Sequence, residues 1–143
     1  WGRGVFKSTD GGENWNAINT GLSISSVNAL AIDPSTPTTI YVGSRYGEGV
    51  FKSTDGGENW GEINTGLSDR SVYALAIDPL TPSIIYAGTG NGIFVSTDSG
   101  GSWNRINRDP TNSAIFSLVI DPKTPTTLHA GTWGGVYSIY KTK

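Results

Sequence analysis

The chain has 143 residues, of which 36% are apolar and only 15% are charged, with 20 glycines, no cysteine and a net charge of −2. This length suffices for one domain with a core, and the lack of cysteine excludes disulfides and thiolate metal sites. The few scattered charges argue against nucleic acid or an anionic membrane surface as a partner. No apolar run reaches the 18 residues of a transmembrane helix.

Three nearly identical phrases punctuate the chain in order. They read STDGGENW at residues 8–15, STDGGENW at 53–60 and STDSGGSW at 96–103. A period of about 43 residues with turn-rich units predicts a repeat architecture. Because repeated residues usually build the scaffold, function has to be sought among the residues that differ between units.

The second unit is the most complete and predicts four short antiparallel strands. Its apolar and β-branched runs are separated by an Asp-Pro turn at Asp33, a glycine-containing loop after Arg45 and the phrase itself, which forms a hairpin. Four strands in about 43 residues match one blade of a β-propeller. The strands are expected at residues 26–33, 38–44, 49–54 and 59–64.

The whole chain then divides into one all-β domain of roughly three blades. Thirteen strands are expected, and the last one lacks the phrase, since Ile139, Tyr140 and Lys141 stand in its place. The units are a partial blade at residues 1–19, blades at 26–64 and 71–107, and a partial blade at 113–141.

The pattern Ser-x-Asp-x-Gly-x-x-Trp resembles the Asp-box, or bacterial neuraminidase, repeat of secreted bacterial propellers. That family includes sialidases, xyloglucan-hydrolysing glucanases, sorting receptors, photosystem assembly factors and propeller lectins. The resemblance implies a β-propeller, an extracellular or periplasmic location and a structural role for the box. It implies no particular chemistry, because these relatives share blades rather than activity.

Each box is expected to be a hairpin scaffold and not a metal site. Glycine supplies positive φ, the Ser and Asp side chains bond the turn backbone, and the Trp packs between neighbouring blades. The box lacks the carboxylate pattern of a calcium loop, so we expect no metal and no cofactor. The structural set is Ser8, Asp10, Gly12, Trp15, Ser53, Asp55, Gly57, Trp60, Ser96, Asp98, Gly100 and Trp103.

Three blades do not close a ring, since propellers carry 4–8 blades. Two chains supply 26 strands, enough for six blades with one spare third strand each, so a homodimer closed by shared strands is one expectation. The other is that the chain, which starts on Trp1 without a methionine, is a piece of a longer propeller. Both alternatives remain open from the sequence.

Ligand-binding residues are expected in the loops that follow the second and fourth strands, where the units differ most. Aromatic rings beside planar polar groups suit sugars, and packing and solvation are the competing explanation. The lone His129 is interpreted as a packing substitution, and the glycine run at residues 88–92 opens no helix and is no nucleotide loop. The candidates are Arg45, Tyr46, Glu48, Asp69, Arg70, Tyr73, Asn91, Arg108 and Trp133.

Two functions fit these loops: a non-catalytic module that binds a glycan or a protein, and a fragment of a secreted glycoside hydrolase. A hydrolase needs two carboxylates about 5–5.5 or 6.5–9.5 Å apart, for which Glu48, Asp69 and Asp109 are available. The sialidase pattern of three arginines and a Tyr–Glu pair is not reproduced residue by residue. Near-identity of the repeats favours the binding module.

Overall fold

The computed structural model describes residues 4–24, 26–106, 113–133 and 135–140, and every regular element within them is a β-strand. None of these segments forms a helix of the length and apolarity needed to cross a bilayer. The strands make antiparallel sheets in which each strand pairs with its neighbour along the chain.

The first two sheets come from the N-terminal half. A two-stranded sheet pairs β1 (Phe6–Lys7) with β2 (Asn16–Ala17). The second sheet has the order β3 (Ala29–Ile32), β4 (Ile40–Ser44), β5 (Gly49–Ser53) and β6 (Gly61–Glu62). Both match the expected strands in position.

The C-terminal half repeats this pattern. The third sheet contains β7 (Val72–Ile77), β8 (Ile85–Thr89), β9 (Gly92–Ser96) and β10 (Asn104–Arg105). The fourth contains β11 (Ile115–Ile120), β12 (Thr127–Thr132) and β13 (Gly135–Tyr140). The fold class is confirmed: this is part of a β-propeller of about three blades.

The fourth strands are shorter than the sequence predicts, with two residues instead of six in the second sheet. The physical reason lies at Asn64. The Ile63 N–H still donates to the Val50 carbonyl at 2.9 Å, but the next ladder bond is replaced by the Asn64 side chain, whose Oδ1 accepts the Val50 N–H at 2.7 Å. A side chain thus ends the strand early while keeping the backbone satisfied.

The turns between first and second strands are fixed by aspartate, as expected for an Asp-Pro sequence. Asp33 Oδ1 accepts the N–H groups of Ser35 and Thr36 at 2.8 and 3.1 Å. Asp78 and Asp121 make the same pair of bonds in the next two sheets. The first-to-second turn therefore has one construction in all three sheets.

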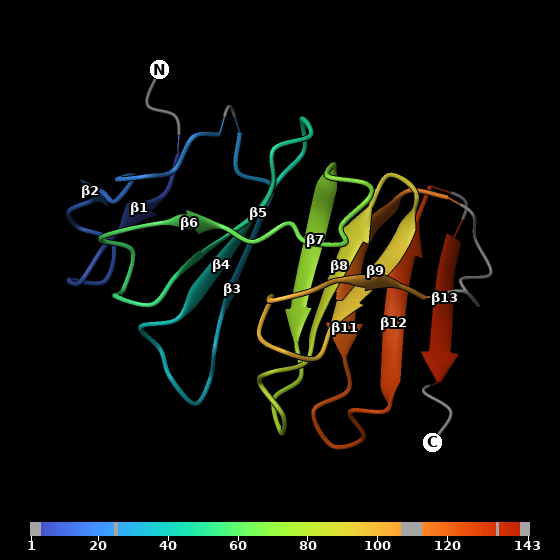
Figure 1. Ribbon diagram of the computed structural model, residues 1–143. Helices are drawn as coiled ribbons and strands as arrows, with labels where there is room; N and C mark the ends of the chain where they lie inside the picture. Colours follow the sequence, from blue (N-terminus) through green and yellow to red (C-terminus); the bar gives the residue numbers. More distant parts are fainter. Residues whose placement is uncertain (1–3, 25, 107–112, 134, 141–143) are drawn as a thin grey trace.

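The sheets follow one another in chain order and stack face against face, from β1–β2 at one end to β11–β13 at the other (Figure 1). Three apolar clusters fill the contacts, which we call seams. They join the first sheet to the second around Val42 and Trp60, the second to the third around Tyr41 and Phe94, and the third to the fourth around Ile93 and Leu128.

Two ends of each sheet can be told apart by hydrogen bonds between loops. The Gly56 N–H of a box donates to Thr38 in the first-to-second turn at 2.8 Å, so boxes and Asp-Pro turns share one end, the box end. The Gly49 N–H donates to the Arg70 carbonyl at 3.0 Å, so the loops after second and fourth strands share the other, the loop end. Candidate ligand residues sit at the loop end.

Candidate functional site

Each Asp-box folds into the same closed network of hydrogen bonds. In the second box the Ser53 hydroxyl donates to Asp55 at 2.7 Å and accepts the Gly57 N–H at 2.9 Å. The Asp55 carboxylate also accepts the backbone and side-chain N–H groups of Asn59, both at 2.9 Å. The other two boxes repeat this arrangement, with Ser102 in place of the Asn at the third.

These bonds stabilise the charged carboxylate in all three boxes. The backbone N–H of Asn14 lowers the pKa of Asp10 to about 2, the Asn59 side chain does the same for Asp55, and the Ser102 backbone for Asp98. The hydrogen bonds that the carboxylates accept therefore come from groups of their own turn. Among the residues described by the structure, no cluster of three or more His, Asp or Glu side chains could hold a metal ion.

The box tryptophans do not all behave as the sequence predicts. Trp60 and Trp103 are buried in the seams, and their Nε1–H groups donate to the carbonyls of Ile18 and Ile63 in the preceding sheet at 2.7 and 2.8 Å. Trp15 is 62% exposed and donates to Gly12 of its own turn at 3.1 Å. The expectation of inter-blade packing is wrong for Trp15, because no described residue lies on its outer side to cover it.

Three aromatic side chains line up at the loop end. The Tyr73 and Phe116 rings lie 5.0 Å apart and tilted, and the Phe116 and Trp133 rings follow at 6.0 Å. Tyr73 and Phe116 occupy the same repeat position on β7 and β11, two first strands that pack side by side. Trp133 is 90% exposed, so the run ends in a bare indole.

Polar groups border this aromatic run. Asp69 accepts the Ser71 N–H at 3.0 Å through Oδ1. A Cβ added to Gly90 would lie 3.2 Å from Asp69 Oδ2 and 3.7 Å from Tyr73 Cε2, which places the carboxylate, the ring and a side-chain-free backbone together. Next to them, Arg105 Nη2 donates to Asn91 Oδ1 at 3.3 Å. We call Asp69, Tyr73, Asn91, Phe116 and Trp133 the aromatic site.

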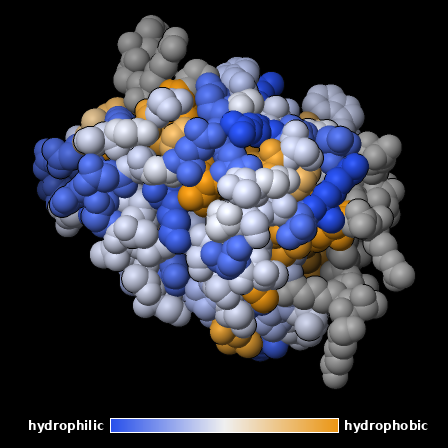
Figure 2. Space-filling view, in the orientation of Figure 1, coloured by the Kyte–Doolittle hydropathy of each residue, from blue (hydrophilic) through white to orange (hydrophobic). Residues whose placement is uncertain are grey.

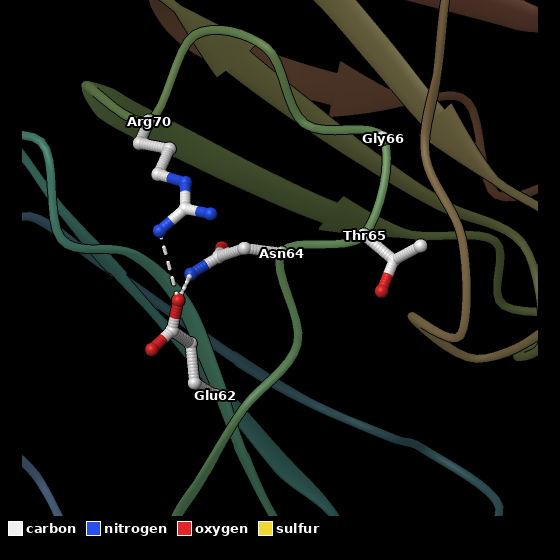
Figure 3. Close-up of a pocket in the computed structure, with 5 residues that line it drawn as sticks. All are labelled: Glu62, Asn64, Thr65, Gly66 and Arg70. Atoms are coloured by element: carbon white, nitrogen blue, oxygen red, sulfur yellow. Dashed lines mark hydrogen bonds and ion pairs between the residues drawn. The ribbon is translucent and has the colours of Figure 1, made fainter.

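Apart from the aromatic site, a hollow of about 490 Å³ lies on the second sheet and is lined by polar groups (Figure 3). Arg70 Nη1 and Asn64 Nδ2 both point at one oxygen of Glu62, at 2.9 and 2.7 Å, while the Thr65 side chain points elsewhere. Arg70 and Glu62 are half exposed, so this pair contributes at most about 1 kcal/mol to stability. Its donors and acceptor are directed at each other instead of at the hollow.

The remaining candidates form a separate group at the loop after β4. The Arg45 guanidinium lies 5.6 Å from the centre of the exposed Tyr46 ring, and the Ser44 hydroxyl donates to the Glu48 carboxylate. The structure therefore brings Tyr73 together with Asp69 and, through Phe116, with Trp133, and Asn91 follows the nearby Gly90 in the chain. In contrast, Arg45 lies over Tyr46 and Arg70 pairs with Glu62. Arg108 and Asp109 lie outside the described residues.

Phe116 is the residue that sequence reasoning missed. Its position in the repeat is that of Tyr73 and Asn28, near the start of a first strand. Comparing the units column by column would have shown two aromatics at one loop-end position. The lone His129 is exposed on β12 and belongs to none of the three apolar clusters. Its expected role as a packing substitution stays a prediction.

Comparison with known proteins agrees with the fold. The model of the BNR/Asp-box repeat matches residues 6–17. An ancestral GH74 enzyme is similar at 29% identity and TM-score 0.78, over 96% of this chain and 20% of its own. The GH74 xyloglucanase from Xanthomonas campestris is similar at 20% identity and TM-score 0.61, over 72% of this chain and 18% of its own.

A third similar structure is YCF48 bound to the D1 peptide, at 20% identity and TM-score 0.76, over 96% of this chain and 44% of that one. No curated protein sequence matches the chain. The chain thus spans about a fifth of the GH74 enzymes and less than half of YCF48. The resemblance to Asp-box propellers is confirmed, and the fold is that of about three blades of a β-propeller.

Proposed function

We propose that this protein is a non-catalytic binding module that takes a glycan across the aromatic site. The observation that carries the proposal is the continuous run of Tyr73, Phe116 and Trp133, whose outermost ring is 90% exposed. An indole so exposed contributes little to the core, and exposed apolar surface of this kind marks interaction sites.

The chemistry of the site suits a sugar. Pyranose rings offer an apolar C–H face to an aromatic ring and hydroxyl groups to polar neighbours. Asp69 beside Tyr73 supplies an acceptor, and Asn91 with Arg105 supplies polar groups at the rim. A chain of several sugar units fits better than one, because three rings follow each other at spacings of 5.0 and 6.0 Å.

The hydrolase alternative has less support. Of its three candidate acids, Glu48 accepts the Ser44 hydroxyl and Asp69 accepts the Ser71 N–H, so both carboxylates bond groups of their own loops. Asp109 lies outside the described residues. We therefore develop the binding proposal and treat hydrolysis as an outcome of its test.

The module is proposed to act outside the cytoplasm of a bacterium, as the resemblance to secreted Asp-box propellers implies, and to work as a homodimeric ring of about six blades. Six lies within the usual range of 4–8 blades. A ring would present the aromatic sites of two chains together, which raises avidity for a polymeric glycan.

The test is a titration with xyloglucan oligosaccharides, followed by a glycan array. Trp133→Ala and Phe116→Ala should each weaken binding about ten-fold, the equivalent of one lost ring contact of about 1.4 kcal/mol. Leu80→Ala is the matched control, because this side chain is also exposed, at 72%, but lies in the turn before β8, at the box end. The control should bind like the parent protein.

Results of the following kinds would overturn the proposal. They are no glycan binding at all, binding that is indifferent to Trp133 and Phe116, and release of reducing sugar that depends on Asp69. Binding of an extended peptide at the aromatic site, in place of any glycan, would also contradict it.

A further inference from the structure

The two ends of the propeller segment expose opposite halves of the same seam. Repeat positions that face the preceding sheet are covered where that sheet has its first two strands: Leu75 is partly buried against the second sheet, and Leu118 is 8% exposed against the third. Its equivalent Leu30 on β3 is 55% exposed, and so is Ile32 at 56%. We call Trp15, Leu30 and Ile32 the leading face.

The leading face lines a groove of about 430 Å³ between β1 and β3. The groove lies where a complete blade has its first and second strands, because β1 and β2 occupy the third and fourth positions. In the second sheet the strand β5, equivalent to β1, pairs with β4 along five residues. Within the described residues, β1 pairs with β2 alone, so the edge of β1 that faces away from β2 has no partner strand.

The fourth sheet presents the complementary half. Val119 on β11, His129 on β12 and Val136 on β13 hold the positions that face the next sheet, and all three are exposed. The equivalent residues of the third sheet, Ala76, Tyr86 and Ile93, pack against the fourth. We call Val119, His129 and Val136 the trailing face. Separate apolar patches on an otherwise largely hydrophilic side of the molecule are visible in Figure 2.

One further position lacks its partner in this chain. The side chains of Ile18 and Ile63 sit under the box glycines of the next blade, 2.3 Å from where a Cβ on Gly57 or Gly100 would be, and their carbonyls accept the Trp60 and Trp103 indoles. Ile106 is the third member of this series, but the blade after it has no box. Gly12 and Trp15 form the one box whose glycine meets no such isoleucine.

We propose that a second copy of this chain completes the blade at each end by strand exchange, an inference that rests on the proposed ring. The β1–box–β2 hairpin of one copy pairs with β12 of the other in place of β13, so that one blade consists of β11 and β12 from one chain and β1 and β2 from the next. Trp15 then donates to the Ile106 carbonyl of the other copy, and Gly12 covers the Ile106 side chain.

A second copy is the occupant that the structure favours. Equivalent contacts between similar repeats are made twice inside the chain, between the second and third sheets and between the third and fourth. The leading face and the two valines of the trailing face are apolar, and His129 is the one titratable side chain among the six residues, so no two like charges oppose each other across the contact. Two copies give about six blades, whereas three give about nine, which exceeds the usual range.

The test measures molar mass by light scattering over a range of protein concentrations. The parent chain should give twice the 15.1 kDa of one chain. Leu30→Arg and Val119→Arg each carry a charge into both junctions of the ring and should give monomers. Leu80→Arg, on a leucine that is 72% exposed and belongs to neither face, should stay dimeric.

Mixing the two monomeric variants sharpens the test. In a heterodimer of Leu30→Arg with Val119→Arg, one of the two contacts between a leading and a trailing face is free of substitutions, so mixing should restore a dimer. If instead two leading faces or two trailing faces met each other, mixing would not restore it. Val136→Arg decides between exchange and simple stacking. If β13 is displaced, this variant stays dimeric, and if it turns monomeric, strand exchange is wrong.

A monomeric parent chain, or an open series of larger oligomers, would overturn the inference. Neither result touches the glycan proposal, because the aromatic site lies within one chain and its titration can be run on the Leu30→Arg monomer. Failure of the assembly and failure of the binding function are thereby separated.

Discussion

Trp103 and Trp15 occupy the same position of the same repeat, yet one is 2% exposed and the other 62%. The hydrogen bonds of their boxes are nearly identical: Ser96 and Ser8 each donate to their aspartate at 2.7 Å. The difference teaches that the box has a local part and a neighbour-dependent part. The hydrogen bonds of the serine and aspartate close the hairpin without help from a neighbouring sheet. Burial of the tryptophan, and the close approach of the glycine to an isoleucine, require a preceding sheet.

The largest effect is expected from removing the indoles. Trp103→Ala should lower the free energy of unfolding by about 3–5 kcal/mol, since it empties a buried site and leaves the Ile63 carbonyl without its donor. Trp15→Ala should cost less than about 1 kcal/mol when the protein is dilute enough to be monomeric. Urea denaturation of both variants measures the difference, and equal losses would contradict the comparison.

A smaller effect is expected from the box glycines. Both Gly12 and Gly100 have positive φ, of 97° and 90°, so alanine is strained at either position by about 1–3 kcal/mol. At Gly100 the new Cβ would also meet Ile63 at 2.3 Å, whereas at Gly12 the nearest atom is 3.8 Å away. Gly100→Ala should therefore lower the melting temperature further than Gly12→Ala. A repacked Gly100→Ala with the same melting temperature as Gly12→Ala would show that Ile63 yields freely.

The smallest effect concerns pH and should be the same in both regions. The hydrogen bonds of the box lower the pKa of each aspartate to about 2, from the ordinary 3.8, so they stabilise the fold fully above about pH 4. That contribution should be lost as the pH falls from about 4 to 2. Asp10→Asn and Asp98→Asn should flatten the acid limb of a melting curve series by similar amounts, and a much larger change for Asp98 would show that the seam contributes.

The sequence predicts the fold well because the same pattern of turns and strands occurs three times. Three copies of the box and of the Asp-Pro turn locate the hairpins, and the strands fall where the apolar runs are. Strand lengths were less predictable, since the bond from Val50 to the Asn64 side chain depends on a tertiary contact. The prediction that Trp15 is buried was wrong for a related reason. The repeat shows that this position packs against the preceding sheet, but the side chain is buried only where such a sheet is present.

The candidate site was only partly predictable. Loop position and residue type were enough to find Tyr73 and Trp133, which the structure joins through Phe116. They gave no information on distance, so Arg45 and Glu48 were grouped with residues that lie on other sheets. Side chains that satisfy each other, such as Arg70 with Glu62, look from the sequence like free ligand-binding groups.

The self-contained box also has a kinetic consequence. Asp10 receives its hydrogen bonds from within residues 8–14, although residues 9–15 of that turn are exposed. Each hairpin can therefore close on its own, on the order of microseconds, while the stacking of whole sheets must await contacts some forty residues apart along the chain. As the polypeptide emerges during synthesis, every box is ready before the sheet that it will support.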